Sequence, residues 1–464
     1  MGILTSRRNS GRASALFEFT QGIDVDCRLA AQEIRVQMAW SEALGKVGFL
    51  SAEDVAKIHA ALGEALAHME AGDFPWEVQD EDIHMNLERF VTERAGTLGK
   101  KMHTGRSRND LIATTLRLYV HDTMGTVITQ VSRLVESLLD RATKDIDILI
   151  PGLTHVQHGQ PIRHGHALAA HAWAFYRDLH RLSVARERAI ETLPLGAAAL
   201  SGTTLMLDFE ELARKLGFTQ PCLNSYDAVG DRDFILEALD AFASFAVHLS
   251  RLSEDCILWS STAFGLIRLP KAWSTGSSIM PNKRNPDVPE LARGKSAHIL
   301  AAAVNAHALL KAVPTSYGSD LHELKSVYMR ALDEVSQCLS IFPDFIGGLE
   351  PDSARAEELL GKGHILATEI ADELTRSGLP FREAYSQVAS LVERAEILGC
   401  QVEKLPEAEW KKVAPSLSSD FVALLTPHSA VERRTAPGGT SLARANEGIE
   451  ELRARLRQFS SRVS

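Results

Sequence analysis

Cysteine is scarce in this chain, with five among 464 residues, at positions 27, 222, 256, 338 and 400. Their number is odd, and no Cys-x-x-Cys spacing occurs. A disulfide framework needs paired cysteines, so the pattern argues against a secreted, disulfide-stabilised fold. We expect buried thiols in a protein of a reducing, cytoplasmic compartment.

Long apolar runs and an excess of positive charge are also missing. The longest uncharged runs, such as Ser296 to Leu310, are too short to span a membrane, and this one is interrupted by His298, Asn305 and His307. Lys and Arg total 50 against 60 Asp and Glu, which gives a net charge of −10. We therefore expect neither a nucleic acid nor an anionic membrane as a partner, although a local basic loop can still bind an anion.

Helical periodicity, by contrast, is abundant. The chain is 45% hydrophobic, enough for a large core and for more than one domain. Between about residues 109 and 144, apolar positions recur at steps of four, three and four, the spacing of a helix-packing seam, at Val127, Val131, Leu134 and Leu138. Comparable segments lie at about 163–191, 231–264, 288–311 and 321–341. This predicts an all-α fold with a central bundle of five long helices.

Proline and glycine mark the breaks between these segments. Turns between antiparallel helices are predicted at Pro151-Gly152, Pro194-Leu195-Gly196, Leu269-Pro270 and Pro314. A shorter helix is predicted before the block, with Ser51 as its N-cap and its end near Ala71. We predict three domains, namely an N-terminal helical domain (1–106), a central long-helix domain (107–349) and a small C-terminal helical domain (350–464).

One loop combines a hydroxyl, an ammonium and an amide, since residues 276–286 read Gly-Ser-Ser-Ile-Met-Pro-Asn-Lys-Arg-Asn-Pro. Gly276 permits a turn whose successive N–H groups form an anion-binding concavity. A helix that begins near Val288 directs its positive end back at the loop. The loop is thus suited to a carboxylate placed beside Lys283 and Asn285, although its Gly and Pro content alone is typical of an ordinary exposed turn.

The same loop resembles the Gly-Ser-Ser-x-Met-Pro-x-Lys-x-Asn-Pro segment of the fumarase/aspartase superfamily at every fixed position. Residues 103–110, His-Thr-Gly-Arg-Ser-Arg-Asn-Asp, match the segment typical of argininosuccinate lyases, and residues 154–161 resemble the Thr-His-x-Gln-x-x-Gln-Pro of the superfamily. The matches extend from about residue 22 to residue 440. This resemblance implies a three-domain fumarase/aspartase-like fold and a β-elimination that releases fumarate.

The resemblance also implies roles for individual residues. Ser277 would be the base that removes a proton, while Lys283 and Asn285 would stabilise the aci-carboxylate that forms. His155, held by Glu290, would donate a proton to the leaving nitrogen. A further set would bind substrate: Asp26, His84, Ser107, Arg108, Asn109, Thr154, Tyr317, His322 and Lys325.

Several positions depart from the family pattern. His322 stands where the family has a substrate-contacting glutamine, and Gly22 replaces a substrate-binding serine. Gly230 replaces the serine of Asp-Ala-Val-Ser-Asp-Arg-Asp-Phe, and only residues 10–13 remain of Trp-Gly-Gly-Arg-Phe. Three functions therefore stay open: cleavage of argininosuccinate to fumarate and L-arginine, cleavage of another N-substituted aspartate, or a catalytically silent, crystallin-like structural role.

Histidines cluster near residue 155 and raise the possibility of a metal site. His164 and His166 would point to nearly opposite faces of one helix, however, and no Cys or Asp completes a set, so we expect no metal and no cofactor. The motif segments lie at opposite ends of long antiparallel helices, and the resemblance implies a homotetramer whose sites take residues from three subunits. Argininosuccinate, fumarate and arginine are the expected small-molecule partners, in arginine biosynthesis.

Overall fold

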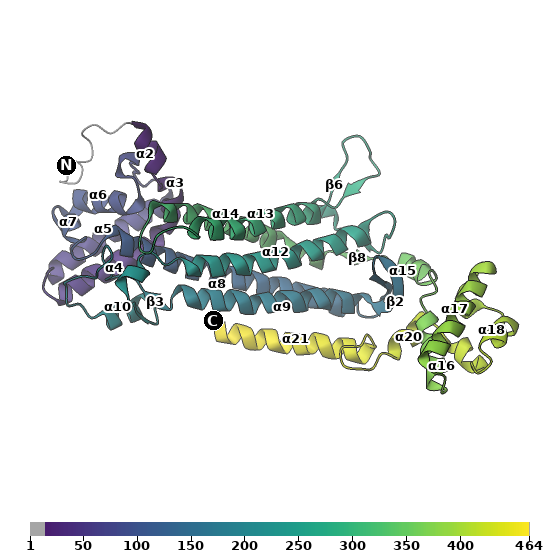
Figure 1. Cartoon of the computed structure of the whole chain (residues 1–464). Helices are drawn as coiled ribbons and strands as arrows, with labels where there is room; N and C mark the ends of the chain where they lie inside the picture. Colours follow the sequence, from purple (N-terminus) through teal and green to yellow (C-terminus); the bar gives the residue numbers. More distant parts are fainter. Residues whose placement is uncertain (1–13, 464) are drawn as a thin grey trace. The chain divides into compact units, whose positions relative to one another are not determined.

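The computed structural model describes residues 14–463, and helices dominate this range (Figure 1). The five predicted long helices are confirmed as α8 (Arg108–Lys144), α9 (His164–Ala189), α12 (Asp233–Ser260), α13 (Asp287–Leu310) and α14 (Glu323–Gly347). The predicted all-α class is therefore confirmed. The remnant segment Ser10-Gly11-Arg12-Ala13 lies outside the described residues.

The chain forms two compact units, and each is assembled from three separate stretches. Unit 1 contains the described residues up to Ile128 together with His180–Ser244 and His298–Val335. Unit 2 contains Thr129–Leu179, Phe245–Ala297 and the chain from Ser336 onward. Long helices such as α8 begin in one unit and end in the other. The division into the consecutive segments 1–106, 107–349 and 350–464 stays a prediction.

Unit 1 also contains shorter helices. They are α2 (Ser14–Thr20), α3 (Ile23–Asp26), α4 (Ala30–Lys46), α5 (Ala52–Ala71), α6 (Ile83–Ala95), α7 (Leu98–Lys101), α10 (Phe209–Leu216) and α11 (Ser225–Ala228), with a short parallel strand pair of β3 (Thr192–Leu193) and β4 (Gln220–Pro221). Trp40 and Phe90 are fully buried in a core to which α4, α5, α6, α7 and α10 contribute, and burial of this apolar area stabilises the fold. Ser51 caps α5 as predicted, because its side chain accepts a hydrogen bond from the Asp54 N–H.

The long helices pack through aromatic side chains within each unit. In unit 1, Tyr328 of α14 stacks on Phe242 of α12 with 5.8 Å between ring centroids. The Tyr328 hydroxyl also lies 2.8 Å from the Thr123 hydroxyl of α8. In unit 2, Phe175 of α9 and Phe245 of α12 are 5.5 Å apart between ring centroids. These contacts give the bundle packing that the apolar seam predicts.

Unit 2 also holds the C-terminal helices α15 (Ser353–Leu360), α16 (Ala367–Arg376), α17 (Phe381–Ile397), α18 (Glu407–Val413), α19 (Ser419–Leu424), α20 (Pro427–Glu432) and α21 (Leu442–Val463). Buried apolar residues of α15 to α18 and α20 share one core, which includes Leu374, Leu391 and Trp410. Glu369 of α16 is almost fully buried and forms an ion pair with Arg434. Among the described residues it is the only buried carboxylate of this core, and the arginine balances its charge.

Two local predictions are wrong. The break at Pro151-Gly152 is an antiparallel hairpin of β1 (Leu149–Thr154) and β2 (Gln157–Arg163), with a register shift between Pro151 and Leu153. The last long helix does not end near residue 341 but continues through Pro343 to Gly347. Phe342 and Phe345 on either side of the proline are buried, and we attribute the continuation to this burial, which outweighs the backbone hydrogen bond that proline removes.

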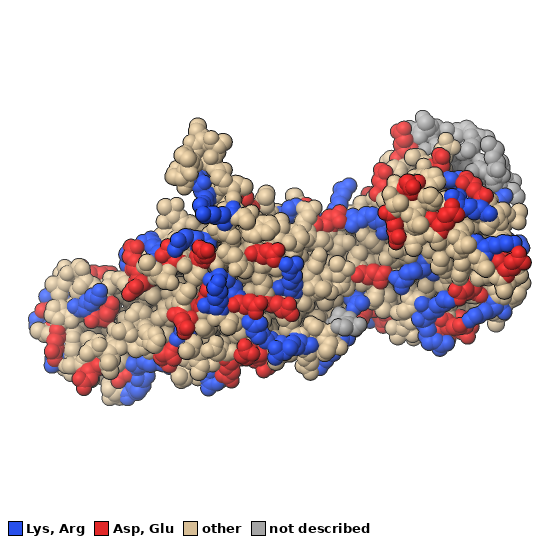
Figure 2. Space-filling model, turned by 180° about the vertical axis from the view of Figure 1, so that it is seen from behind, with Lys and Arg blue, Asp and Glu red and all other residues tan. Residues whose placement is uncertain are grey.

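The surface carries charges of both signs (Figure 2), and the five cysteines differ in burial. On the face shown in Figure 2, lysine and arginine side chains are interspersed with aspartate and glutamate. Within residues 14–463, none of the helices has the length and apolar content needed to cross a membrane. The prediction of buried thiols is confirmed for Cys256 and Cys338 and wrong for Cys27, Cys222 and Cys400, which are half-buried.

Candidate functional site

The start of α8 is held by one buried carboxylate. Asp110 accepts hydrogen bonds from the Ser107 N–H at 3.0 Å, and from Gly196 N–H and Ala198 N–H at 2.9 Å each. Burial raises the pKa of Asp110 to about 6, although the three N–H groups oppose this rise. Asn109 donates to the Ala199 carbonyl at 3.0 Å. The segment 107–110 is thereby tied to the turn at 196–199 in unit 1.

Arg108 lies in an acidic environment at the first position of α8. Its guanidinium forms an ion pair with Asp82 and lies 3.6 Å from a carboxylate oxygen of Glu81. Asp82 also caps α6 by accepting from the Met85 N–H at 2.9 Å. Burial alone would raise the pKa of Asp82, but the charges of His84 and Arg108 lower it. Asp82 is thus ionised and orients Arg108.

His84 and Glu33 form a buried ion pair in unit 1. His84 Nδ1 lies 2.9 Å from Glu33 Oε1, and both side chains are buried. Burial would lower the pKa of His84, but the Glu33 carboxylate raises it above its ordinary value. Thr115 donates to the other Glu33 oxygen at 2.9 Å. Glu33 thereby fixes the position of the His84 ring and favours its protonated form.

Lys325 and Asp26 form another buried ion pair, with side chains that are 3% and 1% exposed. Close by, the Tyr317 hydroxyl is hydrogen-bonded to His322 Nε2. Burial and the Lys325 ammonium lower the pKa of His322 to about 4, so its ring is neutral near pH 7. Asp26, Arg108 and Lys325 all act electrostatically on His322, which places these predicted residues in one cluster.

Unit 2 carries five of the other predicted residues on two hairpins and the sixth, Glu290, on α13. Thr154 pairs with Gln157 across the tip of the β1–β2 hairpin, so His155 and Val156 form its two-residue turn. Both have positive φ, 53° and 60°. Such turns normally use Asn-Gly or Asp-Gly, and a β-branched residue at positive φ is strained. The turn therefore stores backbone strain beside His155, as is frequent at functional sites.

The loop 276–286 is the second hairpin, with β6 (Thr275–Gly276) paired to β7 (Arg284–Asn285), and it extends from the start of α13 (Figure 1). Ser277 Oγ accepts hydrogen bonds from the Ile279 N–H at 3.3 Å and the Met280 N–H at 3.1 Å. At the base of the hairpin, Thr275 donates its hydroxyl to Asp287 at 2.6 Å, which lowers the pKa of that carboxyl. Asp287 therefore closes the hairpin and is the first residue of α13.

The structure separates the predicted residues into two groups. Unit 1 holds eight of them: Asp26, His84, Ser107, Arg108, Asn109, Tyr317, His322 and Lys325. Unit 2 holds the other six: Thr154, His155, Ser277, Lys283, Asn285 and Glu290. Within residues 14–463, no hydrogen bond or ion pair joins His155 to Glu290, and both side chains are exposed, so their pairing stays a prediction. No group of three or more metal-ligating side chains occurs in the described range.

Sequence reasoning missed Glu33, which is the partner of His84. A glutamate within the helix 30–46 resembles a surface residue in the sequence. The one feature of the sequence that indicates burial of Glu33 is its position between the core residues Leu29 and Ile34. Asp110 was visible only as the last residue of a matching motif, because its partners at 196 and 198 are far away in the chain.

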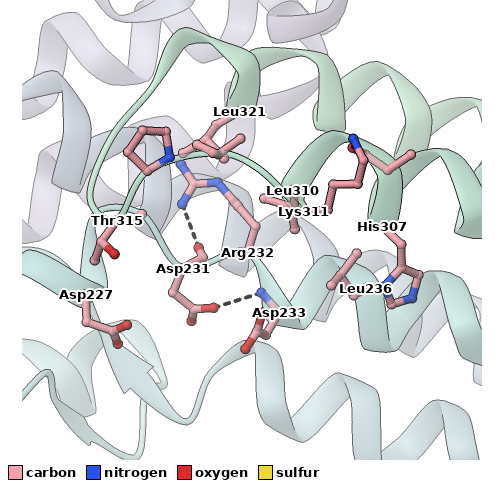
Figure 3. A pocket seen from close by; sticks show the side chains of 14 residues that line it. Asp227, Asp231, Arg232, Asp233, Leu236, His307, Leu310, Lys311, Thr315 and Leu321 are labelled. Atoms are coloured by element: carbon pink, nitrogen blue, oxygen red, sulfur yellow. Dashed lines mark hydrogen bonds between the residues drawn. The ribbon is translucent and has the colours of Figure 1, made fainter.

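Unit 1 contains a cavity of about 620 Å³, whose lining includes Leu321, the residue that precedes His322 (Figure 3). Its lining contains none of the predicted site residues and includes Asp227, Asp231, Arg232, His307, Lys311 and Thr315. Asp231 pairs with Arg117 and accepts from the Asp233 N–H at 2.8 Å, so it caps the start of α12 and forms an ion pair there. Burial lowers the pKa of Arg232 to about 10, and the guanidinium binds the Asp231 carbonyl at 2.6 Å.

Comparison with known proteins gives consistent matches. A family model described as Lyase matches residues 7–301, and one described as Argininosuccinate lyase C-terminal matches residues 364–432. The argininosuccinate lyase of Trichlorobacter lovleyi is 40% identical over 436 residues, which cover 94% of this chain and 95% of the relative. That of Thiobacillus denitrificans is 41% identical over 440 residues, covering 94% of each chain.

Solved structures share the fold. A variant of EDDS lyase with bound fumarate superposes with a TM-score of 0.85 at 24% identity and covers 100% of this chain and 94% of its own. A class II fumarase from Schistosoma mansoni gives a TM-score of 0.73 at 18% identity, covering 86% of this chain and 90% of its own. The predicted three-dimensional fold is therefore confirmed by proteins that are distant in sequence.

Proposed function

The chain belongs to the argininosuccinate lyases, and from this premise we infer that it is a carbon–nitrogen lyase that reversibly splits argininosuccinate into fumarate and L-arginine. Its setting would be arginine biosynthesis in the cytoplasm. The residues that carry out the reaction are assigned here as a proposal, from their chemistry and their surroundings.

The environment of Ser277 carries this proposal. Elimination requires a base to remove a proton from the carbon next to a carboxylate, and a serine hydroxyl is too weakly basic in water for this task. Two backbone N–H groups donate to Ser277 Oγ. Such donors stabilise an oxyanion, so they lower the energy of the serine alkoxide that would act as the base.

The next step of the reaction requires stabilisation of negative charge. Loss of the proton creates an aci-carboxylate with charge on two oxygens, and Lys283 and Asn285 of the same hairpin would stabilise it. The C–N bond then breaks, with its electron pair moving to the arginine nitrogen, which takes a proton from His155. Arg108, Asn109 and Thr154 would hold the substrate carboxylates.

A homotetramer would bring the two groups of residues into one site. Support comes from α13, which exposes a continuous apolar face on residues Ala297, Leu300, Ala301, Val304 and Ala308. Leu300 is 47% exposed and Val304 is 65% exposed. An apolar stripe at helical spacing on a soluble protein is typical of a helix that packs against another chain.

The test is a fumarate-release assay with argininosuccinate, read by the ultraviolet absorbance of fumarate. The wild-type chain should turn over this substrate. Ser277→Ala should reduce kcat by about 10²–10⁴-fold, because general-base catalysis contributes a factor of this size. Ser278→Ala is the matched control, since Ser278 is the neighbouring serine of the same loop. An unimpaired Ser277→Ala enzyme would remove Ser277 as the base.

A further inference from the structure

The loop 196–205 lies against the segment 105–110, although it contains none of the proposed site residues. The Asn109 side chain donates to a carbonyl of the loop at 3.0 Å. Further along, Leu205 lies so near Gly105 that a Cβ added to this glycine would collide with the leucine side chain. The loop is therefore packed against both ends of a segment that is proposed to bind substrate.

Asp110 joins this loop to the start of α8. Its side chain is fully buried, and its two oxygens bind different partners. Oδ1 accepts from the Ser107 N–H, whereas Oδ2 accepts from the N–H groups of Gly196 and Ala198. Ala198 has a φ of 53°, which costs energy for a residue that carries a side chain. The bond to the Asp110 carboxylate offsets part of this cost and keeps the loop in its conformation.

The strength of these contacts depends on the protonation of Asp110. Hydrogen bonds to an ionised acceptor are about twice as strong as neutral ones, so protonation weakens all three. Burial raises the pKa of Asp110 to about 6, against the three N–H groups and the Arg106 guanidinium of the preceding segment. Positions 196–205 contain no titratable side chain, whereas burial and the Asp110 charge raise the pKa of the Cys222 thiol. The loop is therefore held most strongly above about pH 6.

We infer that Asp110 is a positioning residue for substrate binding, which holds the loop 196–205 against Asn109 when it is ionised and releases the loop when it is protonated. An amide carries two N–H donors, so Asn109 uses one for the loop and keeps the other for a substrate carboxylate. The ligand class is a dicarboxylate, such as fumarate or the succinyl half of the substrate. The inference rests on the proposed function, because it concerns the carboxylates that Arg108 and Asn109 are proposed to bind.

Protonation of Asp110 does not itself unfold the protein. Because its pKa in the folded protein is higher than the ordinary value of 3.8, the folded protein binds this proton more tightly than the unfolded chain. The contribution of Asp110 to stability therefore rises as pH falls from about 6 to 3.8. A loss of ligand affinity over the same range has the opposite sign, so it separates positioning from a purely structural role.

Equilibrium titration of the full-length protein with fumarate at pH 8 and at pH 5 tests this inference. In Asp110→Asn the side chain is neutral at both pH values. Its Kd for fumarate should exceed that of the wild type by about tenfold at pH 8, the effect of a hydrogen bond to a charged group, and should approach the wild-type value at pH 5. Titration of other groups is common to both proteins and cancels in this ratio. Leu205→Ala is the matched control, because it loosens the same loop without changing a charge, so its ratio to the wild type should be equal at the two pH values.

Amide hydrogen exchange of the wild type tests the same contact without a variant, and so it applies even if Asp110→Asn does not fold. After correction for the intrinsic exchange rate at each pH, protection of the Gly196 and Ala198 N–H groups should fall about tenfold from pH 8 to pH 5. The reference is the Cys222 N–H, which binds the Leu193 carbonyl at 3.0 Å outside the loop and should keep its protection.

The outcomes separate this inference from the proposed function. A Kd ratio for Asp110→Asn that does not change with pH would overturn the inference, and so would the same change with pH in Leu205→Ala. Protection of Gly196 and Ala198 that stays constant between the two pH values would overturn it as well. A wild-type protein that neither binds fumarate nor releases it from argininosuccinate would contradict the proposed function, whereas the exchange measurement would still decide whether Asp110 holds the loop.

Discussion

At the scale of single residues, the buried pair of His84 and Glu33 makes folding depend on pH. The pKa of His84 is raised above its ordinary value of 6.5, mainly by Glu33 acting against the effect of burial. Its contribution to stability is therefore fully present below about pH 6.5 and is lost as pH rises through the raised value in the folded state. The pKa of Glu33 is lowered, so its own contribution is lost at the acid end, as pH falls through the lowered value.

Replacing His84 by Gln should expose this dependence. The substitution leaves the Glu33 carboxylate buried without its paired cation, and removing one partner of a buried pair costs about 3–5 kcal/mol. The Arg106 guanidinium, which also acts on Glu33, stays in place. Urea unfolding between pH 6 and pH 9 should show a lower free energy of unfolding at pH 6 and a weaker fall toward pH 9 than in the wild type.

His121→Gln serves as the control for that series. His121 lies 3.2 Å from Asp122 at a half-exposed position, where an ion pair contributes about 0–1 kcal/mol. An equal loss of stability in the two variants, or an unchanged pH profile in His84→Gln, would contradict the role assigned to the buried pair.

The sequence identifies candidate site residues through motifs, whereas their contact partners carry no such signal. Ser277, Lys283 and Arg108 could be predicted because they belong to recognisable motifs. The partner Glu33, by contrast, lies 51 positions before His84 along the chain, as their numbers show. Periodicity could not identify it, because the same helical pattern fits a solvated glutamate and a buried one.

At the scale of elements, a close backbone contact positions the loop that carries Tyr317. A Cβ on Gly230 would lie 2.2 Å from the Ser316 carbonyl oxygen, closer than atoms can approach. Ser316 is buried and has a φ of 78°, so the loop is strained where it meets Gly230. Gly230, which replaces the family serine, allows the two segments to touch.

Gly230→Ala should displace this loop and with it the Tyr317 hydroxyl. We expect a destabilisation of about 1–3 kcal/mol from overpacking, and a loss of kcat/KM for argininosuccinate that approaches about 10²-fold, the effect of a misplacement near 1 Å. Thermal unfolding and the fumarate assay measure the two effects on the same preparation.

Gly63→Ala provides the comparison. Gly63 lies within α5 with no heavy atom within 4 Å of the added Cβ, so this change should stabilise the helix by about 0.5–1 kcal/mol and leave activity unchanged. If Gly230→Ala behaved like Gly63→Ala, the backbone contact would not position the loop.

The long helices were predictable and the hairpins were not. Apolar steps of three and four recur over many turns in α8, and this signal survives local irregularities. The strand β1 reads Leu-Ile-Pro-Gly-Leu-Thr, where proline and glycine disfavour a strand and no alternation shows. Its formation depends on pairing with β2, which is tertiary information. The continuation of α14 through Pro343 likewise depends on burial that the local sequence does not contain.

At the scale of the whole molecule, the two compact units could not be read from the sequence. Each unit draws on three stretches of chain, and the stretches meet inside continuous helices instead of at linkers. Domain boundaries are usually inferred from changes in composition or from flexible segments. A boundary inside a helix carries neither signal, so only consecutive segments such as 1–106 could be predicted.

The division of the predicted residues between the units leads to a prediction about mixed oligomers. Arg108→Ala disables a group of unit 1, and Ser277→Ala disables a group of unit 2. If each site takes its unit 1 and unit 2 residues from different subunits, a mixed oligomer contains some sites in which both groups are intact. Two inactive variants should therefore regain fumarate release after they are unfolded together and refolded, or produced together in one cell.

A mixture of Ser277→Ala and Lys283→Ala is the matched negative case, because both changes fall on the same hairpin and should come from the same subunit at any site. This mixture should stay inactive, whereas the Arg108→Ala and Ser277→Ala mixture should recover activity in proportion to the mixed species seen by native mass spectrometry. Mixed oligomers that form without any recovery would mean that one subunit supplies both groups. The apolar face on α13 would then hold subunits together without completing their sites.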